Sequence, residues 1–459
     1  MTLRLIDSST PACGRFLDQL TRRRGETGGD VDREVGAIIA DVRRHGDRAL
    51  VRLTRRFDGV KLTAATLRVT AEELAAARAS QPTADRRALE LAARRIAEFH
   101  RRTLDRSFSY RDRYGMRLGQ MIRPLERVGL YVPGGMGAYP SSVLMNAIPA
   151  RVAGVREIVM VSPAARTGDR PVVLAAAAIA GVSEVYRIGG AQAVAALAYG
   201  TGSIRPVDKI VGPGNAWVQA AKRMVYGVTD IDKMAGPSEV LIVADAHANA
   251  NWVAADLIAQ AEHGSGDESA VLVTPVRAMA VAVAEAIEQA LADLPRAADV
   301  RRVLDRRGAA IIVGDLDEAI DLANRIAPEH LELDVARPGR LLKRIHAAGA
   351  VFVGGRSPAA LGDYLAGPNH VLPTGGSARF ASPLGANDFV KRTSIIEASA
   401  DALRALGPAT ARLARMEGFE AHARAIEVRG AGRVRATKRH VAETNSRKNE
   451  TRPRPGHGH

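Results

Sequence analysis

The stretch DLIAQAEHG, residues 256–264, ends an apolar helical pattern with an amide and an imidazole. Gln260 and His263 are three residues apart, so they are neighbours on the surface of a helix, while Glu262 points elsewhere. This spacing suits two ligands of one metal ion. It suits a polar helix end equally well, and the two residues by themselves leave both interpretations open.

The stretch NRIAPEHLELD, residues 324–334, places a carboxyl group beside an imidazole. Pro328 ends the preceding helix, and LEL predicts the start of an extended segment. Between them, Glu329 and His330 can divide proton transfers, because an imidazole titrates near neutrality and a carboxylate can activate a water. The alternative is a surface dipeptide in a turn.

Two later stretches add polar side chains. LGDYLAGPNHVLPTGG carries Asp363 and His370 in a loop that is too polar and too rich in glycine for a core. MEGFEAH carries Glu417 and His422 on a late helix, five residues apart and therefore offset by more than one turn. Two imidazole nitrogens and two side-chain oxygens, an acceptable set for Zn²⁺ with Mn²⁺ or Co²⁺ as substitutes, are available on Gln260, His263, Asp363 and His422. Their spacing does not show that they meet.

The composition is typical of a globular chain with more than one domain. The 459 residues exceed the size at which a single core stops growing, and the chain is 46% hydrophobic and 25% charged. No apolar run approaches the length of about 18 residues that a membrane span needs. The opening MTLRLIDSST lacks the apolar core of a signal peptide, so we expect a cytoplasmic protein with no membrane partner.

Cys13 is the only cysteine of the chain. A single cysteine excludes an internal disulfide and an all-cysteine zinc site. A thiol nucleophile is possible only at this position, and its neighbours in the sequence include no other catalytic residue type. We therefore do not expect Cys13 to be catalytic.

The positive charge is concentrated at the C-terminus. From Arg429 onward there are nine Lys or Arg residues and two Glu residues, roughly half of the net charge of +15. The stretch has no apolar period, so we expect residues 430–459 to form a basic, disordered tail. Weak contacts of this tail with nucleic acid are the alternative from another class of function. With 4% aromatic residues, the rest of the chain has no recognisable platform for stacking bases, so no other nucleic-acid contact is expected.

The hydrophobic period changes along the chain. Residues 1–126 carry apolar residues at spacings of three and four, which predicts a helical arm for packing or dimerisation. Short runs rich in Val and Ile then alternate with Ala-rich helical stretches, which predicts parallel sheets covered by helices on both faces. The simplest division is into two α/β domains, 127–236 and 237–380, followed by a helical segment, 381–429.

Glycine-rich connections interrupt the α/β pattern, namely YVPGGMGAYPSS, GGAQ, VGPGN, AGPSE and AGPNH. Ligands of open α/β sheets gather at the carboxyl ends of the strands, where we expect all five connections to lie. The chain has no G-x-G-x-x-G with an acidic residue about 20 positions later, so a dinucleotide would bind without the usual fingerprint.

Five long motifs strongly resemble histidinol dehydrogenases, over about residues 5 to 428: YVPGGMGAYPSSVLMNAIPA, IDKMAGPSEVLIVAD, AQAEHG, NRIAPEHLEL and GDYLAGPNHVLPT. The resemblance implies two incomplete Rossmann-like domains with smaller helical parts in an intertwined homodimer. It also implies a zinc- and NAD-dependent oxidation of L-histidinol to L-histidine through L-histidinaldehyde, the last steps of histidine biosynthesis, with one Zn²⁺ per subunit.

The resemblance also implies roles for individual residues. The implied zinc ligands are Gln260, His263, Asp363 and, from the partner subunit, His422. The implied catalytic pair is Glu329 and His330. Substrate contacts are implied for the zinc ligands and for His330, Ser238, His370 and Glu417. NAD contacts are implied for Tyr131, Gln192 and Asn215.

A relative with the same fold could oxidise another alcohol, such as a sulfonated diol. It would keep QAEH and APEH and change the residues that contact the substrate. The joint presence of Ser238, His370 and Glu417 favours histidinol.

Overall fold

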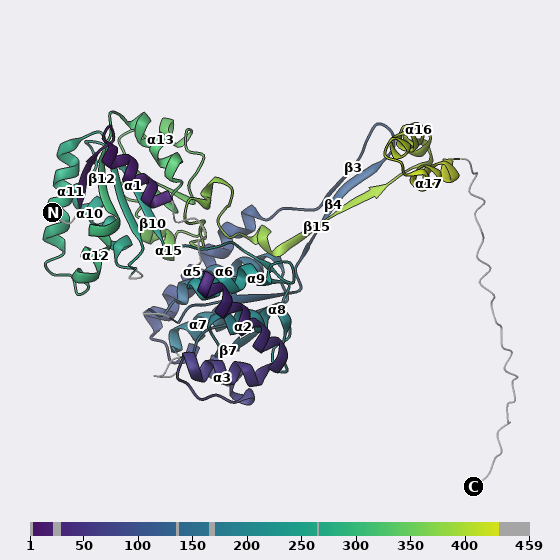
Figure 1. Ribbon diagram of the computed structural model, residues 1–459, viewed down its shortest axis with the longest axis horizontal. Helices are drawn as coiled ribbons and strands as arrows, with labels where there is room; N and C mark the ends of the chain where they lie inside the picture. The colour runs from purple at the N-terminus through teal and green to yellow at the C-terminus, as the bar shows by residue number, and fades with distance from the viewer. Residues whose placement is uncertain (1–2, 22–28, 135–136, 165–169, 264–265, 431–459) are drawn as a thin grey trace, which may run out of the picture. The chain divides into compact units, whose positions relative to one another are not determined.

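Figure 1 shows the computed structural model of the protein, which describes residues 3–21, 29–134, 137–164, 170–263 and 266–430. The chain forms two compact units, Met1–Arg106 with Ile122–Arg392 and Ser107–Met121 with Thr393–His459. Among the residues that the structure describes, no helix has the length and apolar character of a membrane span. The expected basic tail, apart from Gly430, lies outside the described residues.

The first unit contains two six-stranded sheets. The strands of the first sheet lie in the order β2 (Arg68–Val69), β7 (Glu184–Tyr186), β6 (Glu157–Val161), β5 (Arg127–Tyr131), β8 (Lys209–Val211) and β9 (Asp230–Ile231). Only β2 is antiparallel to its neighbour. The runs rich in Val and Ile form β5 to β8 as expected, because strands buried on both faces are apolar along their whole length.

The second sheet is parallel throughout. Its strands lie in the order β1 (Arg4–Asp7), β12 (Gly308–Ile312), β11 (Ser269–Thr274), β10 (Glu239–Ala244), β13 (His330–Asp334) and β14 (Ala350–Val353). Alternate strand residues point to opposite faces, so Val240 and Ile242 belong to one core and Leu241 and Val243 to the other.

Helices cover both faces of each sheet, which confirms the expected α/β class (Figure 1). The first sheet packs with α4 (Ala71–Ala79), α5 (Thr83–Thr103), α6 (Pro140–Ala153) and α7 (Pro171–Ala180) on one face. Its other face packs with α2 (Gly29–His45), α3 (Asp47–Phe57), α8 (Gly190–Tyr199) and α9 (Ala216–Val225).

The helices of the second sheet are divided in the same way. One face packs with α10 (Ala250–Ala261), α11 (Arg277–Ala290) and α12 (Ala297–Arg307). The other packs with α1 (Pro11–Thr21), α13 (Leu316–Ile326) and α14 (Pro338–Leu342). The short helix α15 (Ala359–Tyr364) follows β14, and 3₁₀ turns occur at η1 (Ala64–Thr66), η2 (Ser377–Arg379) and η3 (Ala386–Phe389).

The N-terminal region differs from the helical arm expected for residues 1–126. β1 is an edge strand of the second sheet, where Leu5 lies opposite Ala310, and α1 packs on that sheet. By contrast, α2 and α3 cover the first sheet. Their apolar faces predicted helices correctly, but helical periodicity does not identify the surface on which a helix packs.

A third sheet was not expected from the sequence. It has three strands in the order β15 (Val390–Glu397), β4 (Arg117–Pro124) and β3 (Phe108–Arg111). Every residue of β3 is exposed, so this strand lacks the apolar pattern that marked the buried strands. The C-terminal segment, expected to be helical from residue 381, becomes helical only at α16 (Ala400–Met416) and α17 (Glu420–Gly430).

His100 gives a pH dependence to the stability of the fold. It is 2% exposed in α5, and neither ring nitrogen has a hydrogen-bond partner among the described residues. Burial lowers the pKa of His100 from 6.5 to about 4. As the pH falls, His100 therefore takes up a proton in the unfolded chain before it does so in the folded chain. The contribution of neutral His100 to the free energy of unfolding is complete above pH 6.5 and is lost as the pH falls toward 4.

We expect His100→Leu to lose less stability than the parent protein on acidification. Between pH 7 and pH 4.5, the fall in the free energy of unfolding should be smaller by about 2 kcal/mol, since each pKa unit corresponds to about 1.4 kcal/mol. Urea unfolding at a series of pH values measures this difference. Parallel stability curves for the two proteins would contradict the assignment.

Candidate active site

The Glu329–His330 pair lies where β10 and β13 begin. Val240 is paired with His330 in the sheet, and this register brings Ser238 and Glu239 beside Glu329. The Ser238 hydroxyl donates to Glu329 Oε2 at 2.5 Å, and the Glu239 backbone N–H donates to the same oxygen at 2.9 Å. Glu329 and His330 are both buried, so the pair is not a surface turn.

The hydrogen bonds of His330 leave one ring nitrogen available. Its Nδ1 lies 3.0 Å from the Glu239 carbonyl oxygen, an acceptor to which a protonated Nδ1 donates. Its Nε2 is buried without a hydrogen-bond partner among the described residues and lies 3.7 Å from Asp363 Oδ1. In the neutral imidazole, Nε2 is then the proton acceptor.

The electrostatics of the pair are dominated by burial and by charge. Burial raises the pKa of Glu329 above its usual value, although the charge of His330 and two hydrogen bonds oppose the increase. Burial lowers the pKa of His330, but the charges of Glu329 and Asp363 outweigh it and raise that pKa to about 9. A cation bound at Asp363 would offset the carboxylate and bring His330 closer to the pKa of a general base.

The structure places Gln260, His263 and Asp363 in the same unit as Glu329 and His330. Gln260 is buried at the end of α10, and its Nε2 has no hydrogen-bond partner among the described residues. His263 lies beyond the last helical residue, in a turn in which its Nδ1 is 3.2 Å from the Gln260 carbonyl oxygen. Gln260 and His263, the two expected metal ligands, are therefore near each other, although they do not lie on one helix as expected.

Asp363 is surrounded by imidazoles. Burial raises its pKa, but three imidazoles, led by that of His330, outweigh the burial and lower it below its usual value. The other two belong to His370 and His263. The Asp363 carbonyl oxygen also lies 2.9 Å from His370 Nδ1, which leaves His370 Nε2 for another partner.

Glu417 and His422 lie in the second unit. They were expected on one helix, but Glu417 is the C-cap of α16 and His422 belongs to the next helix, α17. The break occurs at Gly418, whose φ of 82° is left-handed and ends the helix. Among the described residues, no group of three His, Cys, Asp or Glu side chains could hold a metal ion.

The residues expected to contact NAD lie at the carboxyl edge of the first sheet. Tyr131 ends β5, and its hydroxyl accepts a hydrogen bond of 3.0 Å from the Gly190 N–H. Gln192 lies in the first turn of α8, and Asn215 caps α9 by accepting from Val218 N–H at 3.1 Å. This edge is where an α/β sheet binds ligands.

The Glu329–His330 pair lies at an amino edge, not at a carboxyl edge of the kind where the glycine-rich connections were expected. Glu329 and His330 are at the amino end of β13, and AGPNH follows α15 rather than a strand. AGPSE does follow a strand of the first sheet, because residues 232–238 run from β9 to the start of β10. The carboxyl edge of the first sheet and the amino edge of the second are therefore joined by seven residues, at most about 25 Å of chain.

Two further groups support the site and were missed in the sequence. Glu239 acts through its backbone N–H and carbonyl, which no side-chain pattern reveals. Glu332 shares a strand face with His330, and its Oε1 accepts from Ala359 N–H at 2.8 Å, at the start of the helix that carries Asp363. The sequence contained one signal for Glu332: it is two residues after His330, and residues two apart in a strand point to the same face.

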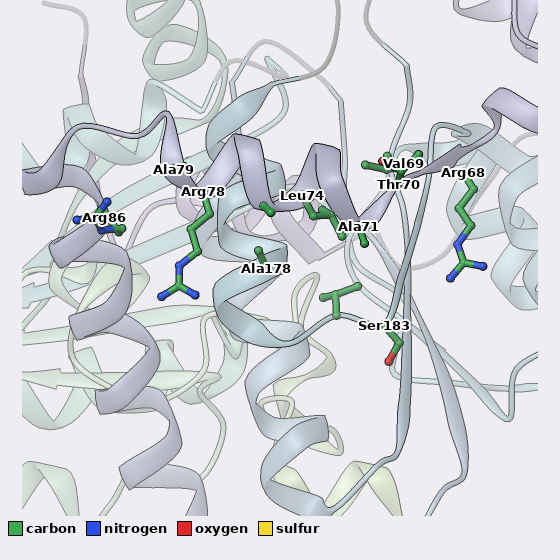
Figure 2. Close-up of a pocket in the computed structure, with 12 residues that line it drawn as sticks. Arg68, Val69, Thr70, Ala71, Leu74, Arg78, Ala79, Arg86, Ala178 and Ser183 are labelled. Atoms are coloured by element: carbon green, nitrogen blue, oxygen red, sulfur yellow. The ribbon is translucent and has the colours of Figure 1, made fainter.

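A cavity of about 730 Å³ lies away from these residues (Figure 2). It is lined by β2, by α4, by single residues of α5 and α7 and by residues 182–183, which precede β7, with Arg68, Arg78 and Arg86 among its polar residues. Arg78 is paired with Glu90 at 3.0 Å. None of the candidate site residues lines it.

Two helix-covered sheets with a buried carboxyl–imidazole pair at a strand end define an α/β enzyme equipped for proton transfer. The sequence pattern of the histidinol dehydrogenases matches residues 21–430. The chain therefore belongs to the histidinol dehydrogenase family, a family of oxidoreductases of histidine biosynthesis.

Individual relatives agree over nearly the whole chain. The histidinol dehydrogenase of Syntrophotalea carbinolica is 54% identical over 430 residues, which are 93% of this chain and 99% of the relative. That of Rhizobium meliloti is 53% identical over 429 residues, 94% of this chain and 98% of the relative. The crystal structure of histidinol dehydrogenase from Elizabethkingia anophelis matches with a TM-score of 0.88 at 33% identity, covering 93% of this chain and 98% of that one.

Proposed function

We propose that the protein oxidises L-histidinol to L-histidine through L-histidinaldehyde, with Zn²⁺ and two NAD. The observation that carries the proposal is the buried Glu329–His330 pair, whose free Nε2 faces Asp363. The family supports the substrate, since a histidinol dehydrogenase takes an imidazole-bearing alcohol.

The two catalytic residues divide the proton transfers. His330 Nε2 takes the alcohol proton as hydride leaves the carbon for NAD, the electron acceptor of both oxidations. Glu329 then deprotonates a water that adds to the aldehyde, because its raised pKa makes it a stronger base than an exposed carboxylate. His330 releases the first proton to solvent and then takes the hydroxyl proton of the resulting hydrate in the second oxidation.

The donor set fits zinc. Gln260 supplies an amide whose buried nitrogen has no partner among the described residues, so the side chain has no other evident role in the core. His263 keeps Nε2 available, and the lowered pKa of Asp363 keeps it ionised. Bound Zn²⁺ would hold the substrate by its imidazole and amine nitrogens and so orient the alcohol toward His330.

The fourth ligand and the remaining substrate contact are proposed to come from a homodimer. The proposed zinc ligands of the first unit are the amide of Gln260, the imidazole of His263 and the carboxylate of Asp363. They are one ligand short of the usual set of four. His422 and Glu417 lie in the second unit, and we assign His422 of the partner subunit to the metal. Ser238 and His370 complete the substrate contacts in the first unit.

A thiol intermediate finds no support. Cys13 is buried in α1 among the apolar residues of the second sheet, and burial raises the pKa of its thiol. Cys13→Ser should therefore keep full turnover.

The deciding measurement is the NADH formed per L-histidinol consumed by metal-stripped protein, with and without added Zn²⁺. Two NADH per substrate, formed only with metal, are expected. If the refilled, folded protein forms no NADH, the substrate assignment is wrong, and other amino alcohols and sulfonated diols become the test substrates. One NADH with release of the aldehyde would contradict the second oxidation.

A further inference from the structure

A buried ion pair lies beneath residues 212–215, the GPGN connection that carries Asn215. Lys222 of α9 is paired with Asp232, which follows β9, and their side chains are 0% and 1% exposed. A lysine without exposed surface needs several acceptors, and Lys222 Nζ also donates to the Gly212 carbonyl at 2.9 Å. The pair is therefore built against the loop.

The loop is held through the backbone N–H and the backbone carbonyl of Gly212. The Gly212 N–H donates to Asp232 Oδ2 at 2.8 Å, while its carbonyl accepts from Lys222. Gly212 has a φ of 113°, and a Cβ there would lie 2.2 Å from the Tyr131 carbonyl oxygen. The loop backbone is thus fixed closely against the residue that ends β5.

Gln219 extends this network to the connection between β9 and β10. Its side chain is buried in α9, where Nε2 donates to the Gly214 carbonyl at 3.3 Å. Its Oε1 accepts from the Ala235 N–H at 3.1 Å. Ala235 is three residues before Ser238, so one amide joins the candidate NAD loop to the segment that leads to the catalytic pair.

We propose that Gln219 and the Lys222–Asp232 pair are positioning residues that hold the dinucleotide loop in its binding conformation and in register with the segment 235–238. The proposal rests on the proposed function, because it takes residues 212–215 as part of the NAD site. These side chains hold backbone groups and need not touch the cofactor.

The test compares three variants of the full-length protein. Gln219→Met keeps the size of the side chain and removes both hydrogen bonds, and Lys222→Met removes the clamp on Gly212. Lys209→Met is the matched control: Lys209 is also buried, pairs with Asp230 at 2.9 Å and donates to the Asp388 carbonyl at 2.8 Å. It begins β8, however, at the opposite end of the strand from Gly212.

The readouts are NADH binding by fluorescence titration, the KM for NAD, kcat and the thermal midpoint. Gln219→Met should raise the Kd for NADH and the KM for NAD about tenfold while kcat changes less than about threefold, since the loss corresponds to two buried hydrogen bonds. Lys222→Met should raise the Kd for NADH likewise. Lys209→Met should lower the thermal midpoint but leave the Kd for NADH unchanged. Should Lys222→Met not fold, Gln219→Met decides the question.

Two results would overturn the proposal in different ways. If the parent protein binds NADH and Gln219→Met binds it equally well, or if Lys209→Met weakens binding to the same extent, the positioning role is wrong and the proposed function stands. If the parent protein does not bind NADH, the proposed cofactor fails and the inference with it.

Discussion

Replacement of His330 by glutamine should slow both oxidations by about 10²–10⁴-fold, the usual loss when a general base is removed. Glutamine is of similar size and can still meet the Glu239 carbonyl, but its amide cannot take a proton from the alcohol or from the aldehyde hydrate. Rates with L-histidinol and with L-histidinaldehyde, each with NAD, measure the two halves separately. His247→Gln, at an imidazole that is 76% exposed, is the control and should match the parent protein.

Glu329→Gln tests the division of labour between the two residues. It retains an oxygen for the Ser238 hydroxyl and the Glu239 N–H, so the local structure should persist. The aldehyde oxidation should fall by a similar factor of about 10²–10⁴, whereas the alcohol oxidation should change little. Equal losses in both halves would show that Glu329 serves each oxidation.

Asp363→Asn should abolish tight zinc binding and, with it, turnover. Loss of residues that merely support a metal ligand lowers affinity about 10–100-fold, so loss of the only anionic ligand should lower it at least about 100-fold. The measurement is the zinc retained per chain after dialysis against a chelator of known affinity, which does not depend on activity. Asp321→Asn, at an aspartate that is 70% exposed, should retain zinc as the parent protein does.

The same variant separates a metal ligand from an electrostatic partner of His330. If Asp363 only tuned the imidazole, Asp363→Asn would bind zinc with the affinity of the parent protein and show a changed pH profile. Unchanged zinc affinity would therefore remove Asp363 from the proposed ligand set.

The buried sheets were predictable from the sequence because apolar runs such as EVLIVA and SAVLVT have one physical explanation, burial on both faces. The exposed strand FSYR has no such signature, although its pairing with β4 is local and places Arg111 opposite Arg117. β1 was missed for a related reason: RLID is a short edge strand whose partner is far along the chain.

The candidate site was predictable as a set of residue types but not as a geometry. Glu329 and His330 are adjacent in the chain, so their pairing required no fold. The role of Glu239 depends on the register between β10 and β13, and its groups are backbone atoms that every residue has. Pro328 and the following LEL placed the pair before an extended segment, but they could not show that β10 begins beside it.

The edge strand β1 precedes the other described strands in the chain, but its partner β12 comes late. Arg4 and Gly308, which are in contact, are separated by 304 positions, so β1 waits for its partner while the ribosome adds the intervening chain. At about 5–20 residues per second this takes roughly 15–60 s, during which the first sheet, complete by Ile231, can already close. Unpaired β1 is meanwhile a strand edge open to wrong partners. The edge of the second sheet thus cannot be completed by β1 until β12 has been made, so the assembly of this sheet depends on both ends of a long stretch of chain.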